Sequence, residues 1–112
     1  MKEIVYSQRP LDPEIGRVTL KLIADTTGIP MSHMLGPSKA NNVSRARQLA
    51  MKVMRECGMT FHAIGTALGR DHTSVIYGVR RVDEQILEGD TKLKRLVKLG
   101  VSVVKEEAAN AA

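Results

Sequence analysis

Two helical patterns joined by a turn of only three residues limit the folds that this chain can adopt. Thr60 is a suitable N-cap for a short helix that Gly69 ends, and Asp71 is a suitable N-cap for a second helix that runs to about Leu87. Gly65 lies inside the first helix, where a side chain would push the two helices apart, although glycine costs about 1 kcal/mol in helix propensity. These features together predict a helix-turn-helix.

The rest of the sequence predicts more helices and no convincing strand, so the predicted fold class is all-α. Asp12 is expected to cap a first helix that Gly28 ends. The polar stretch 37–42 predicts a loop, after which Ser44 is expected to cap a long helix that Gly58 ends. Apolar residues of that long helix recur at steps of three and four: Ala46, Leu49, Ala50, Val53, Met54 and Cys57.

The length of 112 residues indicates one domain with a modest core. Residues 1–11 show no sustained periodicity of apolar residues and are expected to be a flexible N-terminal arm. Residues 12–98 are expected to form the helical domain. Residues 99–112 are expected to be a C-terminal helix extension whose last residues, 106–112, fray. The apolar residues of this extension offer a surface for a partner or a second copy; they are Val101, Val103 and Val104.

The positive charge is concentrated in the middle of the chain. Residues 37–81 hold eight basic and two acidic residues, a net charge of +6, whereas residues 1–36 sum to zero and residues 82–112 to −1. This distribution indicates a polyanionic partner, nucleic acid before a membrane surface. The scarcity of aromatic residues disfavours modules that stack single-stranded bases. A single cysteine, no apolar run of transmembrane length and no signal peptide indicate a cytoplasmic protein.

The first turn of the second helix of the helix-turn-helix is composed of small or hydrogen-bonding residues. Helical side chains lean toward the N-terminus, so His72, Thr73 and Ser74 are expected to project beyond the helix end. A recognition helix meets base edges in the major groove at this end. Threonine offers a hydroxyl and a methyl group, and histidine offers a donor or an acceptor. Asp71 is expected to cap the helix and to contact bases as well.

Cations elsewhere in the basic segment are candidates for further DNA contacts. Arg45, Arg47 and Gln48 alternate with apolar residues at the start of the long helix, and we expect them to face outward toward phosphates or base edges. Arg80 and Arg81 lie on the predicted outer face of the recognition helix, where phosphate contacts are expected.

Two segments, VSRARQLAM (43–51) and GRDHTSV (69–75), resemble the C-terminal DNA-binding domain of the bacterial replication initiator family DnaA. The resemblance covers about residues 13–98. It implies a Trp-repressor-like helical bundle that binds a short A·T-rich DnaA box in duplex DNA.

The resemblance also implies roles for individual residues. The family's base-reading stretch falls on Asp71, His72, Thr73 and Ser74, and its Arg-Gln pair falls on Arg47 and Gln48. The family's loop arginine, which enters the minor groove, falls on Lys39, and backbone contacts are expected from Arg45, Arg70, Arg80 and Arg81. This chain departs from the family at two of these positions, because Ser74 lacks the methyl group of threonine and Lys39 replaces arginine.

No glycine-rich phosphate loop ending in Gly-Lys-Ser/Thr occurs, so no ATPase and no nucleotide cofactor are expected. His33, His62 and His72 share no metal-ligand spacing with Cys57, so neither a metal nor a catalytic site is expected.

The predicted function is that of a stand-alone DnaA-box-type DNA-binding protein. It would be nucleoid-associated and regulate replication initiation or transcription, or compete with the full-length initiator, as a monomer on DNA or a weak homodimer. Two alternatives remain: an excised domain of a full initiator, or a protein-interaction module with only nonspecific DNA affinity.

Overall fold

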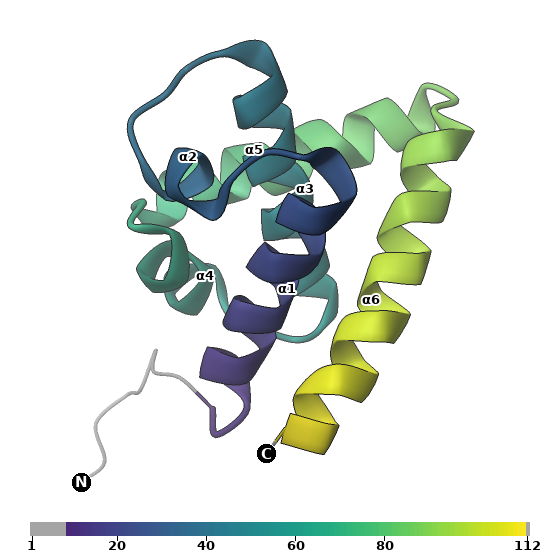
Figure 1. Ribbon diagram of the computed structural model, residues 1–112. Coiled ribbons are helices and arrows are strands. Elements are labelled where there is room, and N and C mark those ends of the chain that lie inside the picture. Colours follow the sequence, from purple (N-terminus) through teal and green to yellow (C-terminus); the bar gives the residue numbers. More distant parts are fainter. Residues whose placement is uncertain (1–8, 112) are drawn as a thin grey trace, which may run out of the picture.

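The computed structural model describes residues 9–111, and within this range the chain forms six α-helices and no strand (Figure 1). The predicted all-α class is confirmed. The helices are α1 (Asp12–Thr27), α2 (Met31–Leu35), α3 (Asn41–Glu56), α4 (Phe61–Leu68), α5 (His72–Leu87) and α6 (Thr91–Ala111).

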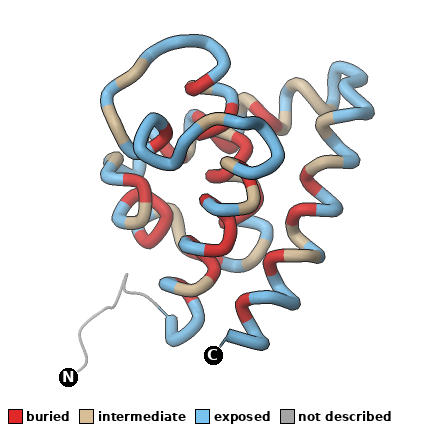
Figure 2. The backbone as a smooth tube through the Cα atoms, viewed as in Figure 1, coloured by how far each residue is buried: buried red, intermediate tan, exposed pale blue. Residues whose placement is uncertain are grey.

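Helix α3 lies at the centre, and α1, α5 and α6 pack around it (Figure 1). Its inward stripe is almost wholly buried, and the surrounding helices also carry buried residues that belong to the same core cluster (Figure 2). The core is aliphatic and rich in methionine, as the scarcity of aromatic residues requires. Its methionines are Met34, Met51, Met54 and Met59.

The helix-turn-helix is formed by α4 and α5, and its predicted local signals are confirmed. The Thr60 hydroxyl accepts a hydrogen bond from the Ala63 N–H at 3.0 Å. The Asp71 carboxylate accepts one from the Ser74 N–H at 2.9 Å. Gly69 adopts a left-handed φ of 67°, and a Cβ atom on Gly65 would overlap the backbone carbonyl of Arg70. The turn therefore depends on residues that lie within a few positions of it.

Two predicted helix starts are displaced. Helix α3 begins at Asn41, not after Ser44, and the Ser44 N–H already donates to the Ala40 carbonyl at 2.9 Å. Ser44 is thus inside the first turn and caps nothing. Helix α1 includes Asp12, whose buried carboxylate accepts the Arg9 N–H at 2.8 Å instead of capping the helix itself.

Helix α6 differs most from the sequence prediction. We expected residues 106–112 to fray, but the helix continues to Ala111 because Val104 and Ala108 are buried in the core. Gly100 allows α6 to approach α3, since a Cβ atom there would lie 3.3 Å from Val53. Two of the three valines proposed as a docking surface are occupied, because Val104 is fully buried and Val101 packs against the core, while Val103 is half-buried. Of the predicted N-terminal arm, residues 1–8 lie outside the described residues.

Candidate nucleic-acid interface

The start of α5 presents its polar side chains to solvent. His72, Thr73 and Ser74 are all exposed, and Asp71 holds the Ser74 N–H with one carboxylate oxygen. The predicted capping role of Asp71 is therefore confirmed, and its second oxygen is left for another partner. Contacts of these four residues with bases stay a prediction.

His72 is stacked on a second histidine. Its ring lies 4.2 Å, centroid to centroid, from that of His62 in α4, with an angle of 23° between the ring planes. Both residues are exposed. This contact was not predicted, because the two histidines lie on different helices and their sequence spacing gives no signal. The stack restricts the orientation of the His72 ring before any ligand binds.

A groove next to the start of α5 brings several predicted residues together. Its volume is about 410 Å³, and it lies between the loop before α3, the first half of α3 and the start of α5. The groove is lined by Lys39, Ser44, Arg47, Gln48, Met51, Arg70, Ser74, Tyr77 and Gly78. Five of these residues were predicted to contact DNA, so the fold collects on one surface cations and polar groups from three separate segments.

Arg47 does not face outward as predicted, since only 8% of it is exposed. Its Nε atom donates to the Met34 carbonyl at 2.8 Å, and its Nη2 atom donates to the Ser38 carbonyl at 3.0 Å. The same Nη2 atom lies 3.2 Å and 3.3 Å from the carbonyls of His33 and Gly36. The outward prediction was wrong because Arg47 belongs to the buried stripe of α3, and its long stem carries the guanidinium to these carbonyls. A sequence signal did exist, since Arg47 is four residues after the buried Val43.

Arg70 reaches the same loop from the other side. Its Nη2 atom donates to the Gly36 carbonyl at 2.6 Å, and its Nη1 atom donates to the Leu68 carbonyl at 3.2 Å. Burial, and then the nearby Arg70 charge, lower the pKa of Arg47 below that of an ordinary arginine. Neither guanidinium forms an ion pair with a carboxylate in the described part of the chain. Two cations thus fix the loop that displays the exposed Lys39, and their charge is not neutralised locally.

Comparison of the sequence with known proteins identifies the family to which this chain belongs. The sequence profile of the family described as the bacterial dnaA protein helix-turn-helix matches residues 17–82, more than half of the chain. The chain belongs to this family. The matched range runs from α1 into α5, so it contains all of α4 and most of α5 of the helix-turn-helix, while α6 lies beyond it.

Three relatives are chromosomal replication initiator proteins DnaA. The protein of Picosynechococcus sp. is 33% identical over 87 residues, which cover 76% of this chain. That of Thermomicrobium roseum is 35% identical over 86 residues, 75% of this chain, and that of Lactococcus lactis is 35% identical over 78 residues, 64% of it. The matched region spans less than a fifth of each relative's length: 19%, 18% and 17%. The resemblance found in the sequence is confirmed for this domain.

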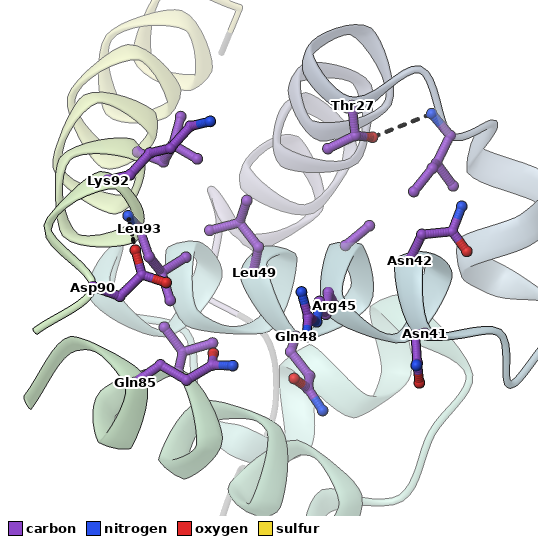
Figure 3. Close-up of a pocket in the computed structure, with 14 residues that line it drawn as sticks. Thr27, Asn41, Asn42, Arg45, Gln48, Leu49, Gln85, Asp90, Lys92 and Leu93 are labelled. Carbon is purple, nitrogen blue, oxygen red and sulfur yellow. Dashed lines mark hydrogen bonds between the residues drawn. The ribbon is translucent and has the colours of Figure 1, made fainter. Parts of the chain in front are cut away.

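Arg45 lies on a different side of α3 of the DnaA-type domain. It borders a second pocket, of about 610 Å³, whose walls come from the end of α1, α3, α5 and the start of α6 (Figure 3). Gln48 borders both this pocket and the groove. Lys92 of α6 lines the same pocket as Arg45, so the predicted contact residues of α3 are divided between two adjoining surfaces.

The outer face of α5 carries a residue that the sequence reasoning missed. Tyr77 is 63% exposed, lines the groove, and lies four residues after Thr73 and three before Arg80. Thr73, Tyr77 and Arg80 therefore share one exposed stripe of the helix. Arg81 lies beside this stripe and forms an ion pair with Glu84 at 3.4 Å.

Lys52 is a cation of the basic segment that is used within the protein. It forms ion pairs of 2.7 Å with both Glu56 and Asp83, and its side chain is 12% exposed. Burial lowers the pKa of Lys52, but the two carboxylates outweigh this effect and raise it overall. The Asp83 pair links α3 to α5.

Within residues 9–111, no group of three or more His, Cys, Asp or Glu side chains is arranged to hold a metal ion. No helix in this range is long and apolar enough to cross a membrane.

Proposed function

We propose that this chain binds double-stranded DNA sequence-specifically at A·T-rich, DnaA-box-like sites. The observation that carries the proposal is the groove in which Lys39, Gln48, Arg70 and Ser74 converge beside the exposed start of α5. Its cations lack ion-pair partners among the described residues, and an anionic backbone would neutralise them. Membership in the DnaA helix-turn-helix family supports the same partner.

In this proposal the start of α5 enters the major groove. His72, Thr73 and Ser74 contact base edges, with Asp71 beside them and Gln48 reaching across from α3. His72 reads its base in the orientation that stacking on His62 imposes. Arg47 acts as a positioning residue, because its bonded N–H groups serve loop carbonyls and not the surface.

Lys39 is proposed to enter the minor groove. The loop that carries it is held at Gly36 and Ser38 by the two arginines, so its position is fixed before DNA binds. This preorganisation lowers the entropy that a flexible loop would lose on binding. Phosphate contacts are assigned to Arg45, Arg70, Arg80 and Arg81.

The biological role proposed is regulation of replication initiation or transcription, with competition against the full-length initiator as one route. This role comes from the relatives' description as chromosomal replication initiator proteins. We propose that the chain has no catalytic activity and is located at the nucleoid. It is proposed to bind DNA as a monomer or a weak dimer. A protein-interaction module is not favoured, because Val104 of its proposed surface is buried.

Fluorescence anisotropy tests the proposal with a DnaA-box duplex and a scrambled duplex of equal length and composition. If about four to six phosphates are contacted, the logarithm of affinity falls with the logarithm of salt concentration at a slope of about −4 to −5. His72→Ala should cost about 1–3 kcal/mol on the box and little on the scrambled duplex. His33→Ala is the matched control, since His33 is also an exposed histidine but lies on α2. Equal affinity of the wild-type protein for both duplexes would contradict sequence-specific binding.

A further inference from the structure

Helix α6 carries a cluster of positive charges at its N-terminal end, where positive charge is unfavourable. Four cations lie in its first eight residues, all exposed: Lys92, Lys94, Arg95 and Lys98. The first turn contains no acidic residue, and the Asp90 carboxylate caps the helix by accepting the Leu93 N–H at 2.9 Å. None of the four cations forms an ion pair within residues 9–111.

This arrangement costs the free protein electrostatic energy. The N-terminal end of a helix carries a partial positive charge, which favours acids and disfavours cations there. Cations three or four residues apart, such as Lys92 with Arg95 and Lys94 with Lys98, also repel each other. An external anion would relieve both effects, so the pattern indicates an anionic partner for this face of α6.

The position of α6 shows which of these cations adjoin the candidate DNA interface. Lys92, together with Leu93 and Leu96, lines the pocket that Arg45 borders from α3 (Figure 3). At about 100° per residue, Arg95 lies about 60° from Lys92 around the axis of α6, whereas Lys98 lies about 120° and Lys94 about 160° from it. Because Gln48 borders this pocket and the groove, the two surfaces are continuous along α3.

We infer that Lys92 and Arg95 form a second phosphate-binding strip with Arg45, so that one DNA strand passes over the mouth of the pocket after leaving the groove. This inference rests on the proposed duplex binding and extends it to a helix that lies beyond the matched family range. The strip contacts phosphates, not bases, and therefore strengthens binding to every sequence alike.

Paired charge variants of equal net charge provide the test. Lys92→Gln/Arg95→Gln removes Lys92, which lines the pocket, and Arg95, its neighbour one turn along. Lys94→Gln/Lys98→Gln removes the other two exposed cations of the same helix segment. Affinities for the box and scrambled duplexes are measured over a range of salt concentrations. Loss of two phosphate contacts should make the salt slope shallower by about 1.8 and weaken binding at least about tenfold at 0.1 M salt. We expect this loss for the first variant, equally on both duplexes, and a much smaller loss for the second.

Ethylation interference gives a positional readout in the same proteins. Phosphates bound by the strip should show interference with the wild-type protein and with Lys94→Gln/Lys98→Gln, but not with Lys92→Gln/Arg95→Gln. Equal losses of affinity in the two variants would show a net-charge effect, and no loss in either would mean that α6 faces another partner. Either result would overturn the proposed phosphate-binding strip. A wild-type protein that binds neither duplex would instead overturn the proposed function itself.

Discussion

Replacing Arg47 by methionine tests whether its buried guanidinium holds the loop that precedes α3. Methionine keeps an unbranched apolar stem but removes the charge and all five N–H donors. In the wild-type protein, Nε and Nη2 donate to the carbonyls of Met34 and Ser38 and lie near those of His33 and Gly36, at 2.8–3.3 Å. These acceptors lie in α2 and in the loop that follows it, so the substitution should loosen both.

The size of the effect follows from these contacts. A hydrogen bond to a charged group contributes about 1.5–3 kcal/mol. Arg47 makes the equivalent of about two: one from Nε at 2.8 Å, and about one from Nη2, whose three contacts are longer and share its hydrogens. Water can reach part of the exposed loop and offsets some of the loss. We therefore expect Arg47→Met to lower the free energy of unfolding by about 2–4 kcal/mol. Arg47→Lys should recover little of this loss, since one ammonium group cannot span the same carbonyls.

Urea unfolding followed by far-UV circular dichroism measures the change. Arg45→Met is the matched control, because Arg45 is an exposed arginine two residues earlier in α3 and should change stability by no more than about 0.5 kcal/mol. If Arg47→Met were as stable as Arg45→Met, the positioning role would be refuted. Loss of box affinity without loss of stability would instead favour the original prediction that Arg47 contacts bases.

Three further predictions concern single residues. Gly65→Ala should destabilise the protein by about 1–3 kcal/mol or more in urea unfolding, because the new Cβ atom meets the rigid Arg70 carbonyl; a variant as stable as wild type would contradict this close crossing. His62→Ala should reduce the preference for box over scrambled duplex by about two- to tenfold through loss of the stack on His72, whereas His62→Phe should retain it. Burial raises the pKa of the Cys57 thiol, so less thiolate exists at a given pH. At about pH 8, iodoacetamide should thus alkylate Cys57 more slowly in the native protein than in urea. Equal rates would show that the fold does not protect the thiol.

The helix-turn-helix and the polar start of α5 could be predicted from the amino-acid sequence alone. The groups that define them act over a few residues: Thr60 bonds the N–H three positions later, Asp71 does the same, and Gly69 ends α4 locally. Such caps depend on residue type and spacing, which a sequence displays directly. Apolar periodicity likewise predicted the buried stripe of α3, because helical geometry places residues three and four apart on one face.

The use of the cations in the basic segment, residues 37–81, could not be predicted from the sequence, because it depends on which distant parts of the chain the fold brings together. Arg47 bonds carbonyls 9 to 14 residues away, and Arg70 bonds the Gly36 carbonyl 34 residues away. The helical end of α6 similarly depends on burial of Val104 and Ala108 in the core, not on local propensity. A guanidinium on a long, flexible stem binds whatever acceptor the fold brings near, so a sequence pattern can place an arginine on a helix without showing whether it faces DNA or the protein's own backbone.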